Sequence, residues 1–298
     1  MKQKPSKQVK VKKNKEYYQL SPKPSEKMLK DYYENIYFQQ LKGSYEKTYS
    51  KDELLYFHNN NSIISICLKK IFNDDIKKKS LLDLGSGEGW TLKYFHKAGC
   101  NVLGVDFSSH GISKFNKPML KYFIEGEILA FIDNCIAENK KFDIINLTNV
   151  IEHVLYPEQL LISIKKILSA EGVVIVTFPN DFSSLQDLLL KKEKISNAFW
   201  VVSPDHISYF NKSSFSKLSA RLGYKQHFYL ADFPIDIFLL NDNSNYITDK
   251  TRGKQAHLSR LEFINLICEH DLNNATEFLL SLGNLGFGRN LTAFLKSK

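Results

Sequence analysis

The sequence has few cysteines and no long apolar run. Its cysteines lie far apart and form no C-x-x-C pair, so we expect no structural zinc site and reduced, buried thiols. No stretch of about 18 consecutive apolar residues occurs, and the N-terminus lacks the apolar segment of a signal peptide. We therefore expect neither a transmembrane helix nor export, and predict a cytoplasmic location.

Acidic residues are missing from the first 15 positions, which carry seven lysines. Removing these seven lysines from the net charge of +9 leaves +2 for the rest of the chain. A nearly neutral body argues against a large phosphate-binding face, so no specific nucleic-acid partner is expected. The lysine-rich segment suits weak contact with a membrane surface, although a solvated, flexible tail is the simpler expectation.

Hydrophobic residues are plentiful by contrast, at 43% of the 298 residues, and can form a substantial core. Residues 1–27 contain three prolines and are predicted to form a flexible basic leader. A helical N-terminal lobe is expected at residues 28–72. Residues 73–298 are predicted to form one domain with a helical lid or insertion at about 181–210, lined by Phe199 and Trp200. The oligomeric state is left open.

Apolar segments alternate with amphipathic ones through the middle of the chain. The predicted strands are residues 80–84, 101–106, 122–127, 142–147 and 173–178, with candidate edge strands at 225–230 and 290–295. Strands that alternate with helices imply a mostly parallel sheet covered on both faces. The predicted fold class is therefore α/β, with a doubly wound, Rossmann-like sheet of seven strands.

The first of these strands runs into a glycine-rich turn. Gly85, Gly87 and Gly89 have the spacing G-x-G-x-G rather than the G-x-G-x-x-G of dinucleotide dehydrogenases. Glycines let a ligand approach the backbone and permit positive φ. The spacing indicates a nucleoside cofactor without a pyrophosphate, and so group transfer. Asp83, just before the turn, is placed to accept a hydrogen bond from a ligand ammonium group.

Acidic residues also end the next two predicted strands. Asp106 follows Gly85 by 21 residues, where doubly wound folds hold a ribose diol. Phe107 is expected to flank the adenine, and Glu127 to accept a hydrogen bond from the adenine amino group. Because the carboxyl ends of parallel strands share one edge of a sheet, these residues predict a single nucleoside site.

These motifs resemble the class I S-adenosylmethionine-dependent methyltransferases. The similar segments are residues 82–89, 105–106, 126–127 and 149–154, the last of which is similar to a "V-L-E-H" motif. The resemblance implies S-adenosyl-L-methionine as the cofactor and adds Ser86 and Asn149 to the cofactor-binding residues. Glu127 departs from the aspartate more common in the family, but it keeps the acceptor.

Later segments resemble bacterial methyltransferases found with sugar or surface-polysaccharide genes, and loosely the ubiquinone-type O-methyltransferases. These segments are residues 32–38, 204–210, 221–224 and 286–291. The resemblance implies methyl transfer to a hydroxyl of a small molecule or glycan. A quinone-like phenol, a nitrogen acceptor and a non-catalytic cofactor-binding protein remain the alternatives. The absence of an N-P-P-Y or D-P-P-Y motif argues against methylation of nucleic-acid bases or protein glutamine.

Two histidines are candidates for the base that removes the acceptor proton. His153 follows the fourth predicted strand, next to the expected position of the donor methyl group, and Glu152 beside it would orient it or hold the cofactor. His206 lies in the loop where a substrate lid would be. The choice between the two histidines stays open, as does metal dependence, although no metal site is expected.

Overall fold

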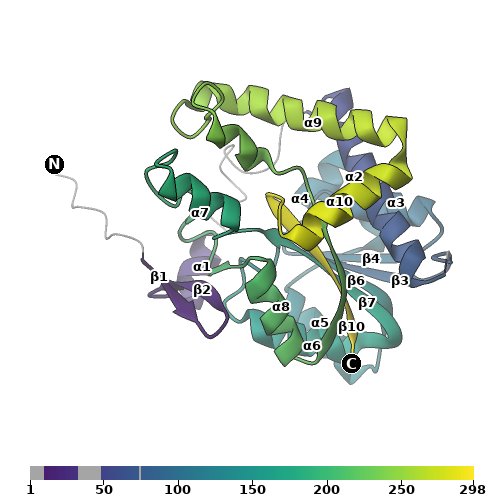
Figure 1. Cartoon of the computed structure of the whole chain (residues 1–298). Coiled ribbons are helices and arrows are strands. Elements are labelled where there is room, and N and C mark those ends of the chain that lie inside the picture. The colour runs from purple at the N-terminus through teal and green to yellow at the C-terminus, as the bar shows by residue number, and fades with distance from the viewer. Residues whose placement is uncertain (1–9, 33–47, 74) are drawn as a thin grey trace.

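The computed structural model describes residues 10–32, 48–73 and 75–298. Its centre is a seven-stranded sheet in the order β5-β4-β3-β6-β7-β10-β9 (Figure 1). The strands are β3 (Ser80–Leu84), β4 (Asn101–Asp106), β5 (Phe123–Glu125), β6 (Phe142–Thr148), β7 (Leu168–Pro179), β9 (Tyr224–Ala231) and β10 (Asn290–Ser297). Only β10 runs antiparallel to its neighbours β7 and β9. The mostly parallel, doubly wound fold is thus confirmed.

Alternate side chains of the strands face two separate layers of helices. Leu81 and Ile144 pack in a cluster with one layer, whereas the next residues, Leu82 and Ile145, pack in a cluster with the other. The first layer contains α2 (Lys51–Ile71), α3 (Trp90–Lys97), α4 (His110–Phe115), α9 (Gly253–His270) and α10 (Leu272–Leu285). The second contains α5 (Ile128–Ala137), α6 (Pro157–Ile167) and α8 (Lys212–Arg221) (Figure 1).

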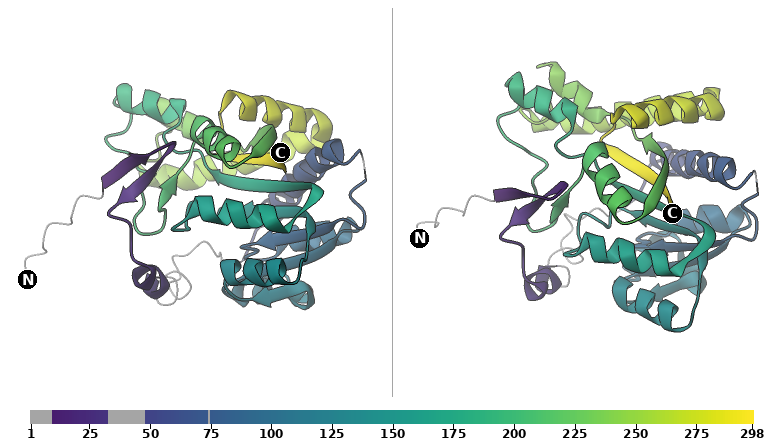
Figure 2. Two further views of the ribbon diagram at one scale, coloured as in Figure 1. Left: turned by 90° about the horizontal axis from the view of Figure 1, so that it is seen from below. Right: turned by 60° about the horizontal axis from the view of Figure 1, so that its bottom comes forward.

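Residues 10–21, expected within a flexible leader, instead form a β-hairpin, so the leader prediction is wrong there. Strands β1 (Lys10–Asn14) and β2 (Tyr17–Ser21) join β8 (Ser208–Tyr209) in a small antiparallel sheet, as both views in Figure 2 show. The reason is apolar burial, since Tyr17 packs its ring against Phe210 and Leu20 belongs to a cluster around Trp200. The lysines of β1 lie on the free edge, where charge opposes pairing with another strand.

The structure also revises the expected accessory parts. The segment 181–210 contains α7 (Ser184–Lys191), but Trp200 is only 1% exposed and fills a core rather than lining a lid. Strand β10 lies inside the sheet, not at its edge, whereas β9 is an edge strand as expected. In the N-terminal lobe α1 (Glu26–Tyr32) and α2 are helical, and the motif at residues 33–38 lies outside the described residues.

Among the helices that the structure describes, none is long and apolar enough to cross a membrane.

Candidate active site

The glycine turn joins β3 to α3 with three residues in the left-handed region. The φ angles of Gly85, Gly87 and Gly89 are +76°, +51° and +76°. The N–H group of Gly85 donates to the carbonyl of Val105 on the neighbouring strand at 2.8 Å. A Cβ atom on Gly85 would lie only 2.4 Å from Cγ2 of Val150. The turn therefore requires glycine both for its backbone conformation and for its close packing.

Replacing Gly85 with alanine is expected to lower the free energy of unfolding by about 2 kcal/mol and to weaken cofactor binding, because it combines a strained φ with a steric clash. Gly126→Ala is a matched control, since no atom lies within 4 Å of a Cβ at that position. Thermal denaturation with and without cofactor compares the two. Equal stability and equal cofactor affinity in the two variants would contradict the role assigned to the turn.

Asp106 binds the glycine turn directly from the end of β4. Its Oδ2 accepts a hydrogen bond from the N–H of Gly87 at 2.8 Å, and its Oδ1 accepts one from Ser108 at 3.3 Å. Burial raises the pKa of this carboxyl above its ordinary value, against the backbone N–H groups that favour the charged form. Asp106 and the half-exposed ring of Phe107 line one end of a cavity of about 560 Å³.

Glu127 has a different position from the one that its adenine-binding role suggested. Its carboxylate caps α5 by accepting hydrogen bonds from the N–H groups of Leu129 and Ala130 at 3.3 and 2.9 Å. The side chain is exposed and is not part of the cavity lining. A helix cap therefore accounts for this residue, and its contact with the cofactor stays a prediction.

Asp83 and Ser86 line a second cavity of about 470 Å³ on the other side of Gly85. Asp83 is 2% exposed, and burial raises its pKa to about 7 although its Oδ1 accepts a 2.7 Å hydrogen bond from Asn146. The Oγ of Ser86 is buried and has no hydrogen-bond partner among the described residues. Asn149, with a φ of +53°, lines both cavities. The two cavities therefore meet at the carboxyl edge of β3 and β6.

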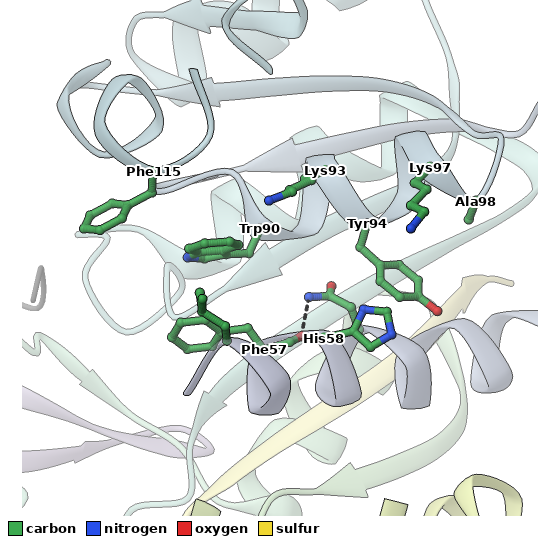
Figure 3. Close-up of a pocket in the computed structure, with 10 residues that line it drawn as sticks. Phe57, His58, Trp90, Lys93, Tyr94, Lys97, Ala98 and Phe115 are labelled. Atoms are coloured by element: carbon green, nitrogen blue, oxygen red, sulfur yellow. Dashed lines mark hydrogen bonds between the residues drawn. The ribbon is translucent and has the colours of Figure 1, made fainter. Parts of the chain in front are cut away.

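A third hollow of about 610 Å³ opens between α2 and α3. Trp90 and Tyr94 extend from α3 toward Phe57 and His58 on α2, with Lys93 and Lys97 along the same helix (Figure 3). The rings of Phe57 and Trp90 stack at 5.4 Å and line the second cavity as well. This aromatic pair therefore separates the cavity at Asp83 from the hollow at the surface.

The two predicted catalytic histidines, His153 and His206, both line the 560 Å³ cavity. Glu152, which follows strand β6, lines it beside them. The rings of His153 and His206 are 4.9 Å apart. Nε2 of His153 lies 3.7 Å from Glu152, and its Nδ1 lies 2.8 Å from the carbonyl and 3.3 Å from the carboxylate of Asp205. The structure thus brings together residues more than 50 positions apart in the sequence.

The charges in this cluster are strongly coupled. Burial raises the pKa of Glu152 to about 7, against the positive charge of His153. Burial opposes a charged His153, but the carboxylates of Glu152 and Asp205 outweigh it and raise its pKa to about 9. Burial and the charge of His153 lower the pKa of His206 to about 4. At neutral pH the cluster therefore contains a charged His153, a neutral His206 and a carboxyl that can gain or lose a proton.

Several polar atoms of the cluster have no hydrogen-bond partner among the residues that the structure describes. Both carboxylate oxygens of Glu152 are buried without a hydrogen bond, and so is Nδ1 of His206. Buried polar groups normally find partners, so atoms left unpaired beside a cavity indicate a bound ligand. Ligand atoms of Glu152, His153 and His206 also lie within 4.8 Å of one another, close enough to hold a metal ion.

The N-terminal hairpin fixes the loop that carries His206. The carbonyl of Glu152 accepts hydrogen bonds from the N–H groups of Ile207 and Ser208 at 2.8 and 3.0 Å. On the other side, Leu20 donates its N–H to the carbonyl of Ile207, and the side chain of Gln19 donates to Ser208. The loop is therefore held between the strand end at Glu152 and a segment nearly 190 residues away in sequence.

The site contains two arginines that the sequence analysis did not assign. Arg289 lines the cavity of the histidines, and Arg260 lines the cavity of Asp83. Arg289 lies within a segment that carried a family resemblance, which was the available signal. Arg260 lies on α9, where the sequence predicted no element.

Comparison with known proteins supports the predicted family. A family model described as a methyltransferase domain matches residues 56–227, more than half of the chain. The chain belongs to the class I S-adenosylmethionine-dependent methyltransferases. S-adenosylmethionine is the cofactor of this family of enzymes, as the family resemblance implied.

Similar curated methyltransferases include the ubiquinone biosynthesis O-methyltransferases of Pasteurella multocida, 27% identical over 109 residues, and Actinobacillus pleuropneumoniae, 32% identical over 104 residues. Each match covers 32% of this chain and 44% of the relative, so the chain spans less than half the length of these relatives. Similar solved structures include a methyltransferase from Archaeoglobus fulgidus, with 18% identity, 80% and 94% coverage of the two chains and a TM-score of 0.47. The plantazolicin methyltransferase BamL has 16% identity, 83% and 86% coverage and a TM-score of 0.48.

Proposed function

We propose that this methyltransferase transfers the methyl group of S-adenosylmethionine to a hydroxyl group of a small molecule, with sugars and glycan-linked hydroxyls included. The observation that carries the proposal is one cavity lined both by Asp106, the expected nucleoside-binding residue, and by the acid and base groups of Glu152, His153 and His206. Methyl transfer to oxygen needs both functions within reach of one another. The names of the curated relatives support an oxygen acceptor.

The donor's position follows from the two adjoining cavities. Asp106 would accept hydrogen bonds from the ribose hydroxyls, with the adenine beside Phe107. The methionyl part would cross Gly85 into the second cavity, where its ammonium group meets Asp83. There Arg260, whose buried Nε has no partner among the described residues, is suited to the methionyl carboxylate.

The protein's own contribution to catalysis is positioning and proton acceptance. When bound, the cofactor would supply an electrophilic methyl group for transfer to an acceptor oxygen. Glu152 would take the proton of the acceptor hydroxyl, because its pKa lies near neutrality and the charged His153 beside it stabilises the ionised carboxylate. Pro179 and His206 line the part of the cavity where the acceptor would lie.

Two other acceptors remain candidates, a quinone-like phenol and a nitrogen. A phenol needs the same proton acceptor, so the cluster at His153 suits both kinds of hydroxyl. A non-catalytic cofactor-binding protein would not need unpaired acid and base groups in the cavity, which Glu152 and His206 provide.

The cluster has a second candidate role as a site for a divalent cation, which the proximity of Glu152, His153 and His206 favours. Dialysis against EDTA separates the two roles. Activity that survives EDTA supports the proton-accepting role. Activity that disappears and returns with Zn²⁺ or Mn²⁺ assigns the cluster to a cation, since two imidazoles and one carboxylate suit a transition metal.

Incubation of the full chain with methyl-labelled S-adenosylmethionine and lysate fractions tests the proposed function. The expected result is label in small molecules or glycans, attached through an ether bond that resists base hydrolysis. Label only in protein or nucleic acid, or no transfer by a protein that binds the cofactor, would contradict it. The His153→Ala variant is the negative control.

A further inference from the structure

Arg289 occupies the acceptor end of the cavity, at the turn into β10. It lines this cavity with Pro179 and His206, away from the Asp106 end. The guanidinium is largely enclosed by protein, and its positive charge reaches the catalytic cluster, where it adds to the effects that lower the pKa of His206. An arginine stays charged at every physiological pH, so this charge is a permanent feature of the acceptor end.

The ion pair of Arg289 leaves most of its donors unused. Nη1 donates to Oδ1 of Asp181 at 2.8 Å, and Asp181 is 1% exposed. Among the described residues this is the one side-chain hydrogen bond that the guanidinium makes, and Oδ2 of Asp181 has no partner. A guanidinium has five N–H donors in a planar fork. A one-point contact therefore holds the group in place and leaves donors for a ligand.

The backbone that carries Arg289 is rigidly supported. The side-chain amide of Asn180 donates to the carbonyls of Gly286 and Gly288 at 2.9 and 3.0 Å, and its backbone N–H donates to the carbonyl of Arg289. A Cβ on Gly288 would lie 2.7 Å from the carbonyl of Asn290, so the turn packs closely. The backbone at Arg289 is therefore held in place by hydrogen bonds, and this preorganisation lowers the entropy cost of binding a ligand.

Other buried acids near Arg289 have partners of their own. Asp236 accepts hydrogen bonds from Tyr246 at 2.7 Å and Gln186 at 3.3 Å. Asp232 accepts hydrogen bonds from the backbone and the side chain of Asn290 at 2.7 and 2.8 Å. These partners are neutral groups, so the hydrogen bonds do not cancel the negative charges of Asp232 and Asp236, which help to raise the pKa of Arg289. Among the described residues, Asp181 is the one acid that contacts the guanidinium directly.

We propose that Arg289 binds an oxyanion of the acceptor, a carboxylate or a phosphate, while the hydroxyl to be methylated faces Glu152 and His153. The inference rests on the proposed function and specifies its substrate class as anionic hydroxyl compounds. The planar guanidinium fork matches both oxyanions and would hold the acceptor in one orientation toward the donor. Arg289 is in this sense a specificity-determining residue.

Anion exchange of the labelled products tests the proposal. Wild-type protein is incubated with methyl-labelled S-adenosylmethionine and a small-molecule extract, and the product is applied to a quaternary ammonium column at pH 8. We expect the labelled product to be retained. Arg289→Gln should lower its yield at limiting extract by about 10- to 100-fold, the usual effect of losing a charged hydrogen bond, while Arg289→Lys retains part of it. Phosphatase treatment distinguishes the sources, since only a phosphate ester would lose retention.

Three controls separate substrate binding from folding and from the ion pair. Arg252→Gln, which removes an exposed arginine paired with Asp249, should leave the yield unchanged. Each variant should bind S-adenosylmethionine as the wild type does, which shows a folded donor site. The double variant Arg289→Gln with Asp181→Asn removes the ion pair as a unit, so no carboxylate at position 181 is left without its arginine. It should be as inactive as Arg289→Gln alone.

Three results would overturn the proposal. One is a labelled product that flows through the column, and another is an Arg289→Gln variant with the wild-type yield. The third is recovery of activity in the double variant, which would reduce Arg289 to a counter-charge for Asp181. A wild-type protein that binds the cofactor but labels no small molecule would instead refute the proposed function, and with it the inference.

Discussion

Replacing His153 with alanine is expected to lower kcat by about 10²- to 10⁴-fold, with the affinity for S-adenosylmethionine nearly unchanged. Without the imidazolium 3.7 Å away, the buried carboxyl of Glu152 would hold its proton more tightly and could no longer accept one from the substrate. In the described part of the chain, no hydrogen bond or ion pair joins His153 to Asp106 or Gly85, the proposed donor-binding residues. Calorimetric titration with the cofactor and a transfer assay on the same preparation give the two quantities.

A control variant and two variants of Glu152 test whether the loss of activity is specific to the pair of His153 and Glu152. His110→Ala removes an exposed histidine at the start of α4 and should leave kcat unchanged. Glu152→Gln should cost about as much as His153→Ala, and the double variant should cost little more than either single one, because His153 acts through the ionised form of Glu152. Full activity of His153→Ala would exclude it as part of the base, and additive losses would show that the groups act separately.

Replacing Asp106 with alanine is expected to weaken S-adenosylmethionine binding by about 100-fold or more. The change removes the proposed acceptor for the ribose hydroxyls and also the 2.8 Å hydrogen bond that holds Gly87 in the glycine turn. Two charge-assisted hydrogen bonds, each contributing about 1.5–3 kcal/mol, give a loss of at least this size. Isothermal titration of the folded variant measures it.

Asp133→Ala is the control for Asp106, since it removes an exposed carboxylate from α5 without reaching the glycine turn. Its cofactor affinity should equal that of the wild type. An Asp106→Ala variant that binds the cofactor with unchanged affinity would remove the ribose-binding role from this residue. Asp106→Asn should lie between the two, because its amide keeps one oxygen as an acceptor for Gly87.

The sheet and the donor end could be predicted because their signals are local. Residues 80–89 contain an apolar strand followed by the glycine turn at Gly85, Gly87 and Gly89, so ten residues predict both elements. Asp106 follows Gly85 by 21 residues, the spacing typical of the second strand end in doubly wound folds. The rule that parallel strands end at one edge then places these residues together. His153 belongs to the same edge, so its position beside the cavity also follows from the order of the strands.

The parts that could not be predicted depend on partners far away in the sequence. Residues 10–21 were predicted to be a flexible leader, because the partners that hold them in a sheet lie far away in the sequence. Tyr17 and Gln19 contact residues 208–210. Pairing between such distant segments leaves no local periodicity to detect. No sequence pattern assigned Arg289 or Arg260 to a site, and their positions in the cavity linings come from the folded structure. A test of membrane contact by the lysine-rich segment should delete residues 1–9 and keep β1, because β1 belongs to the hairpin.

Titration of the wild-type protein with S-adenosylmethionine tests the central claim most directly, because every proposed role depends on a donor at the edge of β3 and β4. We expect saturable binding of one molecule per chain, displaced by S-adenosylhomocysteine and lost in Asp106→Ala. A folded protein that shows no binding, or one that binds equally well after Asp106→Ala, would contradict it.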